Sequence, residues 1–205
     1  LEKKQFFYDG NKANAAITWV EEHCFHVEGE LAPGNLLLET WQKAFLSCVY
    51  GLVDSEGRRQ FREILLVIGR KNGKTKLMSS VGGYTFRKEG GYGARIFCLA
   101  PKLDQADIIY NNIWQMTLLD PEYQALKEYY SEKDHQKRKV HDDSDLPKHR
   151  QTDLFITASN SQVKKIAFSA KKSDGFNPSL CICDEIASWE GDAGLKQYEV
   201  MKSGM

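Results

Sequence analysis

The chain has 205 residues and a formal net charge of zero, with 28 basic and 28 acidic side chains, and 41% of its residues are hydrophobic. This length and composition are typical of one globular domain with its own core. The balanced charge gives no global sign of nucleic-acid binding, and from the sequence we expect no signal peptide and no apolar run of membrane length. Most of the cysteines lie in apolar segments, which predicts reduced core thiols in a cytoplasmic protein: Cys48, Cys98, Cys181 and Cys183.

Two helices are predicted before residue 60, over residues 11–25 and 38–50, because apolar side chains recur there at helical spacing. A break over residues 32–35 separates them. Gln42 lies in the second segment, and its amide can offer both a donor and an acceptor to the edge of a nucleotide base. A solvated surface glutamine is the alternative for that position.

Residues 64–68 form an apolar, β-branched run that predicts the first core strand, buried on both faces. A loop and then a helix beginning with Lys74-Thr75 follow, which is the layout of a phosphate-binding P-loop. We expect Lys74 to contact the β- and γ-phosphates and the Thr75 hydroxyl to bind Mg²⁺. The loop residues would surround the phosphates: Gly69, Arg70, Lys71, Asn72 and Gly73.

This P-loop pattern lacks one usual feature. A glycine normally stands five residues before Gly73, and Ile68 occupies that position. The alternative is a strand, a turn and a helix with a solvated lysine. A second motif is therefore needed to decide between a nucleotide site and this alternative.

The middle of the chain predicts a second buried strand at residues 95–100, ended by Pro101. Helices should follow from residue 104 and over residues 121–130. Residues 131–151 are charged and lack an apolar stripe, so we expect a surface loop there or a segment that contacts DNA or a neighbouring subunit. Short strands are predicted at residues 153–158 and 165–170.

The second motif is an apolar strand at residues 180–183 followed by Asp184 and Glu185. This is the pattern of a Walker B strand, which delivers one carboxylate to Mg²⁺ and another to the attacking water. Open α/β sheets bind ligands at the carboxyl ends of their strands, where both carboxylates would lie. A core strand that ends in a surface acidic pair is the alternative. Together with Lys74-Thr75, the pair predicts an ATPase with Asp184 as a metal ligand and Glu185 as the catalytic base.

Residues 38–43, 61–63, 69–75 and 173–180, in this order before Asp184-Glu185, resemble the ATPase part of the large terminase subunit of tailed bacteriophages. The Arg-x-x-Gly-Lys-Thr form of the P-loop is similar to the deviant form of these terminases. The resemblance implies an α/β fold of the RecA-like (ASCE) P-loop NTPase class, with a mostly parallel central sheet flanked by helices. We expect a single ATPase domain over residues 1–205. Residues 1–60 would be a helical segment with the adenine contact, and residues 61–205 would be the P-loop core.

The same resemblance implies a motor that uses ATP and Mg²⁺ to drive double-stranded viral DNA into a procapsid in the host cytoplasm. The implied partners are the small terminase subunit, the portal protein and further copies of the chain in a ring. Gln42 would contact adenine, and Arg70 would sense or stabilise the γ-phosphate. Nothing in this chain corresponds to the nuclease domain of these terminases, so we expect endonuclease activity only in a full-length protein.

Two other hypotheses stay open from the sequence. One is a different P-loop enzyme, such as a helicase-like ATPase or a nucleotide kinase, and the other is a non-catalytic nucleotide-binding assembly module. An arginine acting from a neighbouring subunit could be Arg138 or Arg150. The candidate DNA contacts are basic residues in two segments: Lys137, Arg138, Lys139, Lys171 and Lys172.

Overall fold

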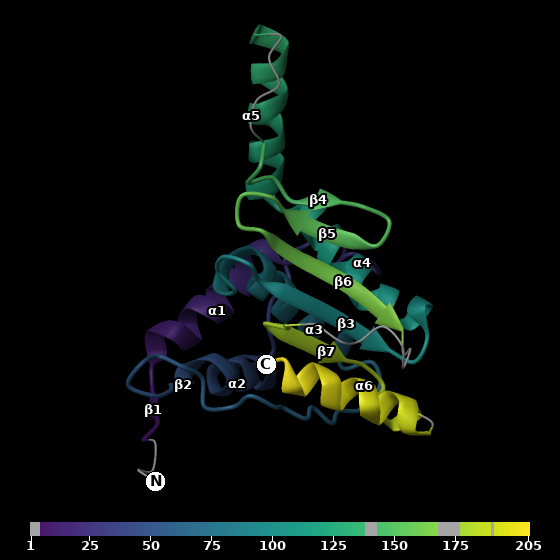
Figure 1. Cartoon of the computed structure of the whole chain (residues 1–205). Helices are drawn as coiled ribbons and strands as arrows, with labels where there is room; N and C mark the ends of the chain where they lie inside the picture. The colour runs from purple at the N-terminus through teal and green to yellow at the C-terminus, as the bar shows by residue number, and fades with distance from the viewer. Residues whose placement is uncertain (1–4, 138–142, 168–176, 190) are drawn as a thin grey trace.

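A five-stranded sheet lies at the centre of the computed structural model, which describes residues 5–137, 143–167, 177–189 and 191–205 (Figure 1). The strand order is β4-β5-β6-β3-β7. The strands are β3 (Arg95–Ala100), β4 (Lys148–His149), β5 (Asp153–Ile156), β6 (Ser161–Ala167) and β7 (Leu180–Cys183). The predicted strand at residues 95–100 is confirmed, as is the strand before Asp184.

The sheet is mixed, whereas the sequence predicted a mostly parallel one. β3 pairs in parallel with β6 and β7, but the β4–β5 and β5–β6 pairs are antiparallel. The reason is the short turn between Ile156 and Ser161, since a parallel pair needs a long crossover connection. β6 also begins earlier than the predicted residue 165.

β3 is the central parallel strand and is buried on both faces. Ile96 and Cys98 point to one face and Phe97 and Leu99 to the other, and none is more than 3% exposed. Such burial explains why this strand is an unbroken apolar run in the sequence.

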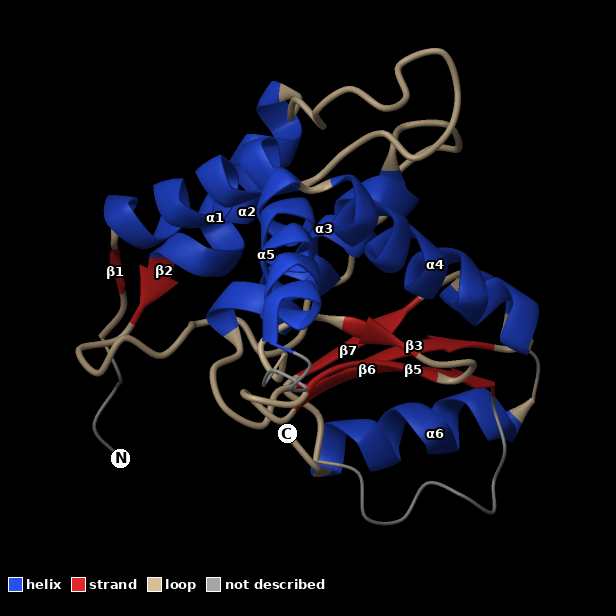
Figure 2. Ribbon diagram, turned by 90° about the horizontal axis from the view of Figure 1, so that it is seen from above, coloured by secondary structure: helices blue, strands red, loops and turns tan. Residues whose placement is uncertain are grey.

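Helices cover both faces of the sheet (Figure 2). α3 and α4 lie on one face with α1 and α2 outside them, and α6 lies on the opposite face. The helices are α1 (Gly10–His23), α2 (Thr40–Gly51), α3 (Lys74–Tyr84), α4 (Leu103–Leu119), α5 (Pro121–Lys137) and α6 (Asp192–Ser203). Shorter elements are β1 (Phe7–Tyr8), β2 (Leu52–Val53), a π-helix (Thr85–Glu89) and a 3₁₀-helix (Ile186–Ser188). The two predicted N-terminal helices are confirmed by α1 and α2.

Two apolar clusters hold these layers together. One joins α4 to the sheet through Ile109, Ile113, Ile96 and Ile182, and the other joins α1 and α2 to α3. α3 and α4 therefore form a middle layer that fixes the N-terminal helices relative to the sheet. Cys48 on α2 is exposed, so the prediction of a buried thiol at that position is wrong.

The predicted core strand at residues 64–68 is wrong. This segment forms no ladder with any described strand, and Ile64, Leu65 and Val67 are 46%, 73% and 82% exposed. Only Leu66 packs against the helical cluster. An apolar run becomes a strand only where a neighbouring strand accepts its backbone hydrogen bonds, and none of the described strands does so.

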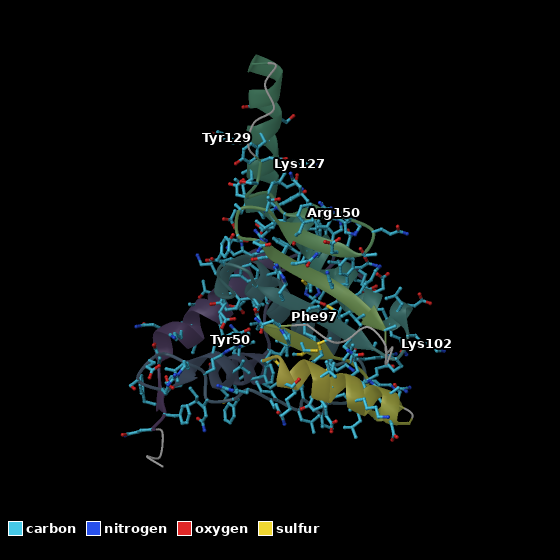
Figure 3. The ribbon with its side chains drawn as sticks, viewed as in Figure 1. Tyr50, Phe97, Lys102, Lys127, Tyr129 and Arg150 are labelled. Atoms are coloured by element: carbon cyan, nitrogen blue, oxygen red, sulfur yellow. The ribbon has the colours of Figure 1, made fainter. Side chains whose placement is uncertain are left out.

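α5 projects away from the rest of the molecule, with Lys127 and Tyr129 on the projecting part (Figure 3). It continues to Lys137, although the sequence predicted its end at residue 130 and a loop after it. The helix carries almost no apolar stripe, which is why its full length escaped detection by periodicity.

Candidate functional site: a nucleotide cavity

A cavity of about 1490 Å³ lies between the N-terminal region and the predicted P-loop. One wall comes from the segment between α1 and α2 and from the first turn of α2, including His26, Leu37, Trp41 and Gln42. The other wall consists of residues 68–76, and Asn112 and Glu185 add to the lining. Every predicted cofactor-binding residue lines this cavity: Gln42, Gly69, Arg70, Lys71, Asn72, Gly73, Lys74 and Thr75.

Lys74 and Asp184 bring the two sequence motifs together at this cavity. The Nζ atom of Lys74 lies 2.6 Å from Oδ1 of Asp184, with side-chain exposures of 35% and 15%. The two residues lie on different elements, since Lys74 begins α3 and Asp184 follows β7. The phosphate-binding lysine and the metal-binding carboxylate of the sequence prediction therefore occupy one site.

The loop before α3 has the backbone of an anion-binding concavity. Lys71 and Gly73 have φ values of 64° and 73°, and alternating left-handed residues turn successive N–H groups toward one point. No side chain caps the N-terminus of α3, so its first N–H groups have no side-chain acceptor at the cap. The donors and the helix dipole at this end fit a bound phosphate.

Both its backbone conformation and its surroundings favour glycine at position 73. A Cβ atom there would lie 3.3 Å from Nε2 of Gln42, in addition to the strain of its positive φ. Gln42 is 6% exposed, and its Oε1 accepts a hydrogen bond of 2.8 Å from the N–H of Glu39 in a capping box. One lone pair of Oε1 is engaged in this way, whereas no hydrogen bond of the amide nitrogen is recorded among the described residues.

Glu185 has a strained backbone and one fixed carboxylate oxygen. Its φ is 51°, in the left-handed region, and its N–H donates to Oδ1 of Asp184 at 2.8 Å. Oε2 of Glu185 accepts a hydrogen bond of 3.1 Å from Nε2 of Gln105, in the first turn of α4. The indole N–H of Trp189 donates to the Asp184 carbonyl at 3.0 Å, which holds the turn after β7.

Gln105 and Trp189 were missed by the sequence analysis. A signal for Gln105 was present, because α4 follows β3 and the predicted strands 95–100 and 180–183 can be neighbours in one parallel sheet. In the structure Leu99 pairs with Cys183, so the carboxyl ends of both strands meet. Gln105, the third residue of the helix after β3, then lies beside Glu185.

His26 and Lys76 add a titratable pair to the wall of the cavity. Lys76 Nζ lies 3.2 Å from Nδ1 of His26, and both residues line the cavity. Burial, and secondarily the positive charge of Lys76, lower the pKa of His26 below its ordinary value of 6.5. The neutral imidazole is thereby favoured, and its Nδ1 can accept a hydrogen bond from the ammonium group.

Comparison with known proteins shows to which family the chain belongs. The family model described as "Terminase large subunit, ATPase domain" matches residues 40–205. The chain belongs to this terminase family. Membership places it among the P-loop NTPases and implies that it binds a nucleotide.

Two curated relatives are similar to the chain in sequence, and one solved structure shares its fold. The chain is 26% identical over 181 residues to the terminase large subunit of Enterobacteria phage HK97, covering 88% of this chain and 31% of that protein. It is 23% identical over 192 residues to the terminase large subunit of Lactococcus phage p2, covering 92% and 32%. The crystal structure of the HK97 large terminase has the same fold, with a TM-score of 0.70 and 21% identity over 97% of this chain and 35% of that one. The chain thus spans about a third of the length of these relatives.

The oxygen donors in this terminase chain fit a hard divalent cation. Thr75 lines the cavity in the first turn of α3, and Asp184 lies against the neighbouring Lys74. Hydroxyl and carboxylate oxygens are the ligands that Mg²⁺ prefers, usually together with water and phosphate oxygens. Thr75 and Asp184 therefore offer oxygen donors of the type that the sequence analysis assigned to Mg²⁺, and that assignment stays a prediction.

The remaining predicted residues lie at the rim of the site or elsewhere. Arg70 is exposed and lines the cavity. Arg150 lies beside β5 (Figure 3), where its guanidinium carbon stacks 4.0 Å from the centre of the Phe155 ring. The side chain of Lys137 and the whole of Arg138, Lys139, Lys171 and Lys172 lie outside the described residues. Within the described part of the chain, no helix is long and apolar enough to cross a membrane.

Proposed function

We propose that this chain is the ATP-hydrolysing motor domain of a terminase large subunit that drives double-stranded viral DNA into a procapsid in the host cytoplasm. The observation that carries this proposal is the contact between Lys74 and Asp184 beside the uncapped N-terminus of α3. It supports a site that binds a phosphate chain and a metal ion together. The family match over residues 40–205 supports DNA packaging rather than another use of ATP.

The proposed roles follow from where each side chain lies. Lys74 binds the β- and γ-phosphates with the N–H groups of residues 69–75, and Arg70 approaches the γ-phosphate from the rim. Thr75 and Asp184 hold Mg²⁺, which when bound neutralises the charge that develops on the phosphates. Glu185 accepts a proton from the attacking water. The amide nitrogen of Gln42 contacts the adenine edge.

In this proposal residues 1–205 form a single ATPase domain of the RecA-like class. Residues 1–60 contribute the wall for the base, and residues 61–205 contribute the phosphate site. We place endonuclease activity outside this chain. The small terminase subunit, the portal protein and further copies of the chain in a ring are the proposed partners, and repetition of a weak contact around a ring raises its avidity for DNA.

The test is ATP hydrolysis with Mg²⁺, measured with and without double-stranded DNA. We expect Glu185→Gln to keep Mg-ATP binding and to lose turnover by about 10²–10⁴-fold, because a positioned general base contributes that much. Glu199→Gln, which removes an exposed carboxylate on α6, is the matched control and should hydrolyse ATP like the parent. Parent-like turnover in Glu185→Gln would exclude Glu185 as the base. ATP binding without hydrolysis by the parent would favour a non-catalytic assembly module.

A further inference from the structure

Gln105 makes an unusual combination of contacts at the edge of the cavity. Its Nε2 donates a hydrogen bond of 3.1 Å to Oε2 of Glu185. Its Oε1 is buried and has no hydrogen-bond partner among the described residues. One end of the amide therefore binds a carboxylate in the site, while the other end is unsatisfied.

The orientation of this amide follows from the charge of its partner. An ionised carboxylate only accepts hydrogen bonds, so the amide must turn its NH₂ group toward Glu185. The opposite orientation would place two acceptors against each other. Oε1 is consequently left in a buried position where its desolvation is not compensated.

Stability alone does not explain a glutamine at this position. An apolar side chain of the same length, such as methionine, would remove the unsatisfied acceptor and keep most of the packing. A buried acceptor without a partner is costly, so the benefit of the amide must lie in its bond to Glu185.

We propose that Gln105 is the positioning residue that aims the Glu185 carboxylate at the attacking water. This inference rests on the proposed function, in which Glu185 is the base. Glu185 lines the cavity and Gln105 is not among its lining residues, so Gln105 acts through Glu185. With Oε2 held by the amide, Oε1 of Glu185 is left for the water.

The fold makes Gln105 a rigid support for this purpose. It stands in the first turn of α4, next to Ala106, which is 1% exposed, and α4 packs on the sheet through Ile109. Glu185, in contrast, follows β7 in a left-handed conformation and leads into a short 3₁₀-helix. A bond from the packed helix therefore restricts the more strained partner. The amide also has no proton to lose near neutral pH, so it cannot compete with Glu185 as an acid or base.

The experiment compares Gln105→Met with Gln115→Met, which changes an exposed glutamine on the same helix. We expect Gln105→Met to lower kcat by about 10- to 100-fold, which corresponds to one hydrogen bond to a charged group. ATP affinity should be unchanged, and the free energy of unfolding should be equal to or higher than that of the parent. Gln115→Met should retain the parent kcat.

A second variant tests whether a loss of kcat in Gln105→Met comes only from altered packing. Gln105→Glu has nearly the same shape but places a carboxylate opposite Glu185, so it should lose turnover at least as strongly. The inference is overturned if Gln105→Met keeps the parent kcat while Glu185→Gln loses it, a result that leaves the proposed function intact. It is also overturned if Gln105→Met loses stability and ATP affinity together with kcat, because that pattern indicates a structural role. Absence of turnover in the parent would overturn the proposed function and this inference with it.

Discussion

Residues 64–68 and residues 180–183 are two short apolar runs, and each leads into one half of the candidate site. The second run is β7, which pairs in parallel with β3 and buries Ile182 to 5% exposure. The first run lies outside the sheet, and Val67 is 82% exposed. Lys74 and Asp184 nevertheless meet at 2.6 Å, so the two halves of the site come together although only one preceding run belongs to the sheet.

The difference separates two conditions that a strand must satisfy. An apolar composition makes burial favourable, and both runs have it. A strand also needs a neighbour that accepts its backbone hydrogen bonds. β3 is that neighbour for residues 180–183, whereas no described strand pairs with residues 64–68. Sequence composition reports the first condition and says nothing about the second.

The largest expected effect of this difference is on stability. Ile182→Ala should lower the free energy of unfolding by about 2–4 kcal/mol, because a buried side chain in the core that joins the sheet to α4 is truncated. Val67→Ala should change it by less than about 0.5 kcal/mol, since this side chain is exposed. Both values can be measured by urea denaturation of the same chain.

The pair of variants can also contradict the comparison. If Val67→Ala lowers the free energy of unfolding as much as Ile182→Ala does, then residues 64–68 are buried in solution. The contrast between the two runs then disappears. Amide hydrogen exchange would then show protection at residues 64–68 similar to that of residues 180–183.

The next largest expected effect is on ATP affinity, and it differs between the two residues of the Lys74–Asp184 contact. Lys74→Ala should weaken ATP binding with or without Mg²⁺, by about 10- to 100-fold, because it removes a charge-assisted contact to phosphate worth about 1.5–3 kcal/mol. Asp184→Asn should weaken only the part of the affinity that depends on Mg²⁺. Binding titrations with and without the metal distinguish the two. Equal Mg²⁺ dependence in both variants would contradict the separate roles of the two halves.

Much of this site could be predicted from the sequence because its parts are local. Lys74-Thr75 and Asp184-Glu185 are each set by a few adjacent residues, and the strands at residues 95–100 and 180–183 are marked by continuous apolar runs. Strand pairing is not local, so the mixed sheet and the isolation of residues 64–68 were missed. Gln105 was missed for the same reason, since its role depends on β3 and β7 being neighbours.

The smallest expected effect is a pH dependence that arises on the wall of the cavity next to the P-loop. Burial and the nearby Lys76 lower the pKa of His26 below 6.5, so the unfolded chain takes up this proton at a higher pH than the folded chain does. The unfolded state therefore binds more protons as pH falls below about 6.5, and the free energy of unfolding should decrease through that range. At higher pH His26 is neutral in both states and contributes no pH dependence.

Urea denaturation from about pH 7.5 to about pH 5.5 should show a weaker pH dependence of the free energy of unfolding for His26→Asn than for the parent. Lys76→Met should reduce the effect only in part, because burial is the larger cause. An identical pH dependence in His26→Asn and the parent would show that this wall of the cavity is open to water, in contrast to the buried core behind β7.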